Sequence, residues 1–189
     1  MFRPKRETKP PEKYGFEDLY LKSPVWGPLN AHGWGTSMEV VLNGGDLSGG
    51  SKGTPPEIHM KKSSGYISGH LLNEELGGWG EKKNMVPLTN QANSLHATYE
   101  NYVKLLITIA KYLKAHFGKT YGVYYRVVAD DKWTSRDFGG YAPVSLILDI
   151  ELIQFLDGSP IPLNKTETDY FNSHYPKMAS KYAKINIPN

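Results

Sequence analysis

The sequence predicts a single α+β domain built from strands around one long helix. Residues 95–117 place apolar side chains at helical spacing, which is typical of a helix with one buried face. Residues 121–129 and 142–152 alternate between apolar and polar side chains, which is typical of strands with one buried face. The chain has 189 residues, 39% of them hydrophobic, which is enough for one core, and no internal repeat points to a second domain.

The composition narrows the possible classes of protein. With no cysteine, the chain has no disulfides, no thiolate zinc site and no cysteine nucleophile. No segment approaches the roughly 18 apolar residues that span a bilayer, so we expect no membrane association. No signal peptide is visible, because the first fifteen residues are charged and proline-rich. We therefore expect either a cytosolic protein or a domain of a longer polypeptide that is exported by other means. The net charge of +3 leans toward polyanionic partners.

The N-terminal part contains fewer regular signals. Residues 1–14 are rich in Lys, Arg and Pro and predict a linker or tail, so the predicted domain covers residues 15–189. Residues 15–36 suggest irregular packed structure. A short strand is predicted over residues 38–42, closed by an Asn-Gly-Gly-Asp turn, and another over residues 58–68, which leads into His70.

The predicted helix has the clearest pattern in the chain. At about 100° per residue, one stripe of it is apolar: Leu95, Tyr99, Tyr102, Leu106, Ile109, Leu113 and Phe117. Gly118 follows at the position where glycine often ends a helix. A C-terminal helix is predicted to begin near Thr166, in a weak capping box with Asp169, and to be interrupted at Pro176.

Polar side chains form a second row on the long helix. Asn93 and Glu100 are seven residues apart, so they share a face, and His96 lies between them. This row lies roughly 90–150° around the helix from the apolar stripe. We expect the stripe to pack on the main sheet and the polar row to face the segment that carries His70. Asn93 also suits a helix N-cap, and the cap and a ligand position are compatible.

These residues resemble the ββα-metal (His-Me finger) fold and, within it, the DNA/RNA non-specific endonuclease family. The segment from Asn84 to Glu100 is similar to that family's NMSPQ…N…LE. The order GHLLN…LGG…G…N…P[IL]T…AN…H…E, which begins at Gly69, resembles bacterial toxin nucleases. The family usually has Asp-Arg-Gly-His where this chain has Ser68-Gly69-His70, so its arginine is missing, and the Asn93–Glu100 spacing is one residue shorter.

The resemblance implies a mainly antiparallel sheet packed against a long helix, with the ββα core over about residues 57–118. It also implies one Mg²⁺ or Mn²⁺ ion, held by Asn93 and by Glu100, which would complete the shell or hold a metal-bound water. His70 would be the general base, since a neutral histidine accepts a proton near pH 7. Asn73 and Asn84 would orient His70 or contact phosphate. His96 would contact substrate or act as a second ligand, unless it is an ordinary surface histidine.

A replacement for the missing arginine must come from a nearby basic residue. Lys61 and Lys62 precede His70, and Arg126 lies on a predicted strand; we assign these three as candidate phosphate contacts beside Lys82, Lys83 and Arg136. Lysine pairs on loops are also common simply as solubilising groups. Trp79, in the glycine-rich loop after His70, suits either stacking on a base or anchoring the loop.

The sequence thus predicts a metal-dependent, sequence-nonspecific endonuclease that hydrolyses DNA and possibly RNA. The toxin resemblance implies the toxic domain of a delivered bacterial effector that acts in a target-cell cytoplasm, with a cognate immunity protein in the producing cell. One alternative is a zinc hydrolase that uses His70 and His96, although no third ligand stands at a typical spacing. The other is a non-enzymatic module that binds carbohydrate or protein through the Trp- and Gly-rich N-terminal region.

Overall fold

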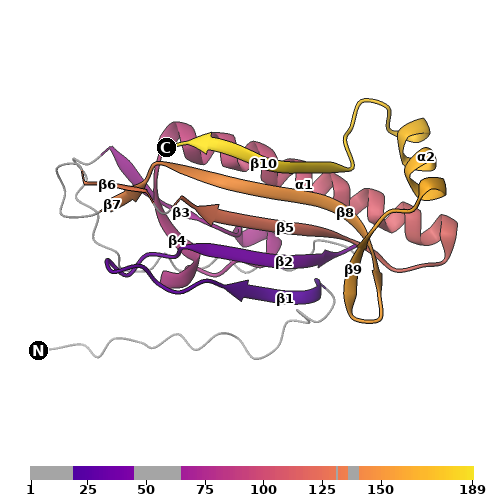
Figure 1. Cartoon of the computed structure of the whole chain (residues 1–189), viewed down its shortest axis with the longest axis horizontal. Helices are drawn as coiled ribbons and strands as arrows, with labels where there is room; N and C mark the ends of the chain where they lie inside the picture. Colours follow the sequence, from indigo (N-terminus) through magenta and orange to yellow (C-terminus); the bar gives the residue numbers. More distant parts are fainter. Residues whose placement is uncertain (1–18, 45–64, 131, 136–140) are drawn as a thin grey trace, which may run out of the picture.

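A computed structural model describes residues 19–44, 65–130, 132–135 and 141–189, and Figure 1 shows their arrangement. A large antiparallel sheet has the strand order β1-β2-β5-β8-β10, with β9 also paired to β8. Two further pairs, β3–β4 and β6–β7, form small two-stranded sheets. The long helix α1 packs across one face of the large sheet, which confirms the predicted α+β class. The predicted tail over residues 1–14 lies outside the described residues.

The described elements run in chain order from β1 to β10. Their bounds are β1 Tyr20–Trp26, β2 Ser37–Asn43, β3 Tyr66–His70, η3 Glu74–Leu76, η4 Lys82–Asn84, β4 Met85–Thr89, α1 Asn90–Phe117, β5 Tyr121–Ala129, β6 Trp133–Ser135, β7 Tyr141–Pro143, β8 Ser145–Leu156, β9 Ser159–Pro162, α2 Lys165–His174 and β10 Lys181–Pro188. The predicted strand over residues 58–68 lies mostly outside the described residues, and its described end belongs to β3.

The long helix begins earlier than predicted. Thr89, and not Asn93, is the N-cap, because the Thr89 hydroxyl accepts a hydrogen bond from the Ala92 N–H. Gly118 ends the helix in a left-handed conformation with φ of 67°, as predicted. Leu95 is 40% exposed, so its place in the buried stripe was wrong. The stripe is buried farther along the helix, from Leu106 to Leu113.

The C-terminal part differs from prediction in three respects. Helix α2 is capped by Asn164 with Glu167, not by Thr166 with Asp169, and it ends at His174. The chain then forms β10, an edge strand that the sequence did not predict. The strand predicted over residues 142–152 is divided at Val144 into β7 and the longer β8.

The N-terminal part also differs from prediction. Residues 15–36, predicted to be irregular, contain β1.

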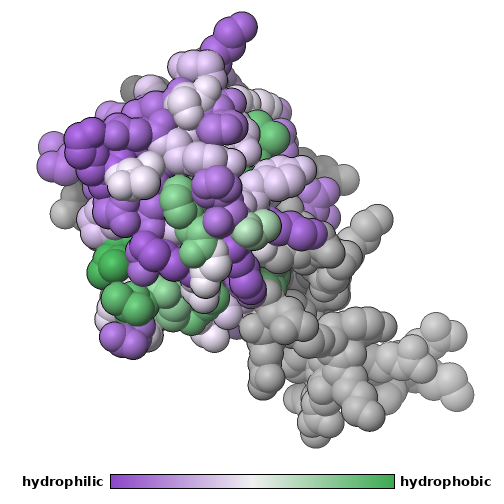
Figure 2. Space-filling view, turned by 90° about the vertical axis from the view of Figure 1, so that its right-hand side faces the viewer, coloured by the Kyte–Doolittle hydropathy of each residue, from purple (hydrophilic) through white to green (hydrophobic). Residues whose placement is uncertain are grey.

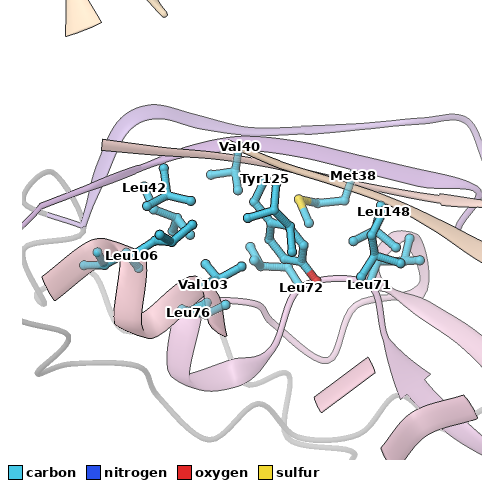
Figure 3. Packing of buried hydrophobic residues seen from close by; sticks show 14 of the residues in the cluster. Met38, Val40, Leu42, Leu71, Leu72, Leu76, Val103, Leu106, Tyr125 and Leu148 are labelled. Carbon is cyan, nitrogen blue, oxygen red and sulfur yellow. The ribbon is translucent and has the colours of Figure 1, made fainter. Parts of the chain in front are cut away.

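The core lies between the large sheet and α1, and the loop after β3 contributes to it. Leu71, Leu72 and Leu76 are fully buried and pack with sheet and helix residues (Figure 3). Burying a leucine side chain is favourable by about 1.5–3 kcal/mol. The three leucines therefore fix the loop that follows His70 in one position relative to α1.

The described residues on the face shown in Figure 2 are mostly hydrophilic, with apolar residues in small patches. Among the described residues, no helix is both long enough and apolar enough to cross a lipid bilayer.

The strands β3 and β4 with α1 form a hairpin-helix unit, in which β4 leads directly into the helix. This unit carries most of the residues predicted for the site.

Candidate active site

His70 is the last residue of β3 and presents an unsatisfied ring nitrogen. Its Nε2 is buried and has no hydrogen-bond partner among the described residues. Burial lowers the pKa of His70, and the charge of Glu74 opposes this shift. The imidazole is therefore neutral at pH 7, with a nitrogen placed where a ligand or a water would complete its hydrogen bonding.

Asn93 lies against the strand that ends in His70. A Cβ added at Gly69 would lie 3.2 Å from Asn93 Oδ1 and 2.4 Å from Leu88 Cδ1. Glycine at this position thus lets the first turn of α1 approach the backbone of β3 closely. Asn93 Oδ1 therefore lies close to Gly69, the residue that precedes His70 in β3.

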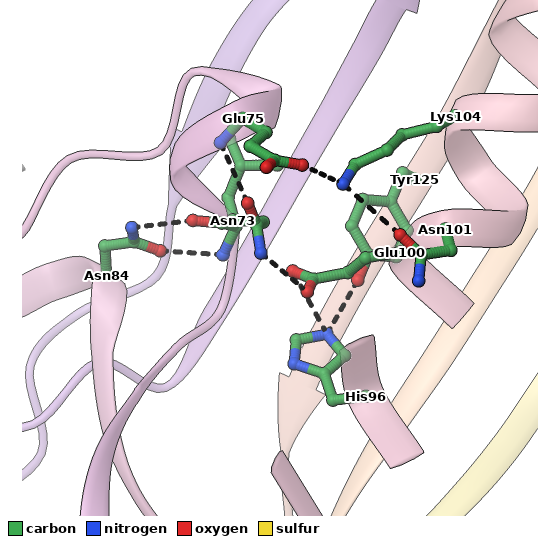
Figure 4. Close-up of polar contacts among 9 residues, drawn as sticks. Asn73, Glu75, Asn84, His96, Glu100, Asn101, Lys104 and Tyr125 are labelled. Atoms are coloured by element: carbon green, nitrogen blue, oxygen red, sulfur yellow. Dashed lines mark hydrogen bonds and ion pairs between the residues drawn. The ribbon is translucent and has the colours of Figure 1, made fainter. Parts of the chain in front are cut away.

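Glu100 is buried on α1, with only 4% of its surface exposed, and it faces the loop after His70 (Figure 4). Asn73 Nδ2 donates a hydrogen bond of 3.1 Å to Glu100 Oε2, whereas Oε1 has no hydrogen-bond partner among the described residues. Burial raises the pKa of Glu100 to about 7, and the Asn73 hydrogen bond and the Lys104 charge oppose the rise. Such a buried carboxylate would be stabilised by a cation beside Oε1.

His96 is buried between Glu100 and the large sheet. It is 2% exposed, so it is not a surface histidine, and its Nε2 lies 2.7 Å from Tyr125 Oη and 4.0 Å from Glu100 Oε1 (Figure 4). Burial, with a smaller contribution from His70, lowers the pKa of His96 to about 4. His96 is therefore neutral near pH 7. The sequence pattern did not assign Tyr125 to the site, although a tyrosine on a buried strand face usually needs a hydrogen-bond partner.

Asn73 and Asn84 hold the loop between His70 and β4. The Asn84 amide is fully buried: its Oδ1 accepts from Leu72 N–H at 2.8 Å, and its Nδ2 donates to the carbonyls of Leu72 and Trp79. Asn73 caps η3 through a bond from Glu75 N–H, besides its bond to Glu100. For Asn84 this placement favours orientation of the loop after His70 over direct contact with phosphate.

The structure does not bring all predicted basic residues to this cluster. Arg126 is exposed on β5 and lies 3.5 Å from Asp149 Oδ2. Because successive strand residues point to opposite faces, Arg126 faces away from the side on which Tyr125 meets His96. Its predicted contact with substrate is therefore not supported by its position. Lys61 and Lys62 lie outside the described residues.

The predicted metal ligands and the zinc alternative can be compared with the donors that the structure presents. Within the described ranges, no group of three or more His, Cys, Asp or Glu side chains converges to hold a metal. The zinc alternative also loses His96 Nε2, which Tyr125 occupies. The predicted ligands offer two oxygens: the Asn93 amide oxygen and Glu100 Oε1, which has no hydrogen-bond partner in the part of the chain that the structure describes. Mg²⁺ usually binds to a small number of protein oxygens and keeps water molecules in its remaining coordination positions.

Residues 43–132 match the family model described as DNA/RNA non-specific endonuclease. The match spans a little under half of the chain, from the end of β2 to just past β5, and it includes His70, Asn93 and Glu100. The family resemblance in the sequence is thereby confirmed for this segment, while the match does not distinguish a toxin type. No curated protein and no solved structure matches the chain.

Proposed function

We propose that this protein is a metal-dependent, sequence-nonspecific endonuclease that hydrolyses phosphodiester bonds in DNA, with RNA as a second substrate. The observation that carries the proposal is that the family match and the candidate site residues lie in the same segment of the chain. The segment that matches the endonuclease family also contains His70 Nε2 and Glu100 Oε1, which are buried without hydrogen-bond partners among the described residues, and Asn93, which lies against β3. Unpartnered buried polar atoms are rare in native proteins, and a bound ligand commonly explains them.

His70 is the general base of the proposed reaction. Its ring is neutral near pH 7, so Nε2 can accept the proton of a water that attacks phosphorus. Asn93 and Glu100 are the residues that would hold one Mg²⁺ or Mn²⁺ ion. When bound, such an ion offsets the negative charge that develops on the phosphate.

Four further side chains position these groups. Asn73 holds one oxygen of Glu100 and so directs the other, Oε1, away from the loop. The Tyr125 hydroxyl engages the His96 ring, which lies against Glu100 from the sheet side. Asn84 fixes the backbone of Leu72, two residues beyond His70. A displacement of about 1 Å in such a site can reduce the rate roughly 100-fold.

We extend the proposal to the biological setting of the enzyme. The likeness of the segment from Gly69 to Glu100 to bacterial toxin nucleases supports a delivered effector that acts in a target-cell cytoplasm, countered by an immunity protein in the producing cell. Expression of the chain inside bacteria should then arrest growth, and His70→Ala should relieve the arrest. Normal growth with active wild-type enzyme present would remove the toxin part of the proposal and leave the nuclease part intact.

The enzymatic proposal is tested with supercoiled plasmid and with total RNA. Wild type should nick plasmid in Mg²⁺ or Mn²⁺, and chelation by EDTA should stop the reaction. His70→Ala should lose about 100-fold or more in rate while it melts like wild type. His174→Ala is the matched control, because His174 is an exposed histidine on α2 and should leave activity unchanged. Intact plasmid and RNA in every wild-type lane would refute the proposal.

A further inference from the structure

A recess next to the candidate site has an unusual lining. It lies between β1 and the loop that joins η3 to β4, and it encloses about 180 Å³. Aromatic rings and two opposite charges line it, together with an amide: Tyr20, Trp26, Trp79, Glu81, Lys83 and Asn84. Trp26 and Trp79 are only partly buried, so the recess presents large apolar rings near the surface.

The aromatic rings of the recess are accompanied by a cation. Lys83 Nζ lies 5.6 Å from the centre of the Trp26 ring and 3.2 Å from Glu81 Oε2. Lys83 is thus held at the recess by contacts on two sides. A positive group beside aromatic faces is the combination that single-stranded nucleic acid binders use, with bases stacked on rings and phosphates near cations.

Trp79 lies on a loop that several other residues anchor. The loop is already fixed by the buried Leu76, by the Tyr20 hydroxyl, which donates to Leu76 O at 3.0 Å, and by Asn84. Gly77 packs so closely on Tyr20 that an added Cβ would lie 1.9 Å from the hydroxyl oxygen. The Trp79 side chain lines the recess that borders this loop.

The recess is connected to the loop after His70 through Asn84. Asn84, which lines the recess, accepts a backbone hydrogen bond of 2.8 Å from Leu71, the residue after His70. Its side chain also bonds Leu72 and the Trp79 carbonyl. A group held in the recess would thus lie beside the same loop that follows His70.

We propose that this recess binds an unpaired nucleobase of the substrate strand, stacked against Trp79 or Trp26, with Lys83 near the adjoining phosphate. The inference rests on the proposed nuclease function and deepens it, because it names the form of the substrate. A base can stack in a recess only when it is not paired in a duplex. The enzyme should therefore favour single-stranded or locally open nucleic acid over intact duplex.

The test measures binding separately from cleavage. In a His70→Ala background, the affinity for a fluorescein-labelled oligothymidylate is measured by fluorescence polarisation at fixed salt. Adding Trp79→Ala should raise the Kd about tenfold, in line with the loss of one stacked base. Trp79→Phe should stay near the parent Kd because it keeps a ring. Tyr112→Ala, which removes an exposed aromatic ring on α1, is the control and should change nothing.

The other possible results distinguish failure of the base site from failure of the nuclease function. An unchanged Kd for Trp79→Ala would overturn the recess as a base site, and plasmid nicking by wild type would show that the nuclease proposal still stands. Should Trp79→Ala melt early, Lys83→Gln decides instead: a Kd equal to that of the parent would overturn the proposal. If labelled oligosaccharides bind in place of oligothymidylate, and Trp79→Ala abolishes that binding, the base-site proposal is overturned and the recess is a carbohydrate-binding site. An inactive wild type that still binds oligothymidylate would refute the nuclease function alone.

Discussion

The contact between Tyr125 and His96 gives a prediction whose size follows from the structure. Tyr125→Phe removes the hydroxyl that lies 2.7 Å from His96 Nε2, and both side chains are buried. Leaving a buried polar group without its partner costs about 1–3 kcal/mol. For a chain of this size, a loss of about 2 kcal/mol lowers Tm by roughly 4–8 °C.

Thermal unfolding followed by circular dichroism measures this loss. Tyr124→Phe is the matched control: it makes the same change one residue earlier, where the hydroxyl donates at 3.2 Å to Glu39 on the opposite, part-exposed face of the sheet. We expect this variant to lose well under 1 kcal/mol. If the two variants melt alike, the His96–Tyr125 contact has no special part in the fold, and our account of why His96 is buried is wrong.

Three further predictions concern the same region. Burial lowers the pKa of His96 to about 4, below its unfolded value near 6.5, so the contribution of His96 to stability should fall by about 3 kcal/mol between pH 6.5 and pH 4. Glu100, whose pKa burial raises to about 7, contributes in the opposite direction over the same range. The His96 part is therefore read as a difference in acid melts: a His96→Leu/Tyr125→Phe double variant should lose less stability than wild type, and equal losses would contradict it. Gly69→Ala should place a methyl group against Asn93 and lower plasmid nicking at least tenfold, and equal nicking rates would contradict the close approach. Asn84→Ala should reduce both Tm, by loss of about 3 kcal/mol, and nicking rate; a full rate despite a lower Tm would show that the loop does not position His70.

The sequence predicted the elements whose own pattern determines them. The alternation in β5 placed Tyr121, Val123, Tyr125 and Val127 on the buried face, and all four are fully buried. Gly118 was assigned as the end of α1 from its position alone. Edge strands were missed, because β10 is largely exposed and its burial shows no simple alternation. Its pairing with β8 depends on the tertiary structure.

The site residues show the same limit. Spacing was enough to place Asn93, His96 and Glu100 on one side of α1, but it does not say which partners bury them. Those partners are Asn73, 27 residues before Glu100, and Tyr125, 29 residues after His96. The N-cap was misplaced because Thr89 and Asn93 are both good caps, and β4 continues to Thr89 before the helix begins.

The central claim is that the His70 ring accepts a proton during phosphodiester hydrolysis. Chemical rescue of His70→Ala tests it most directly: plasmid nicking in Mg²⁺ is measured with and without added imidazole. The account predicts that the variant loses about 100-fold or more in rate and that imidazole restores part of the loss. Nicking by His70→Ala at the wild-type rate, with no response to imidazole, would contradict the account.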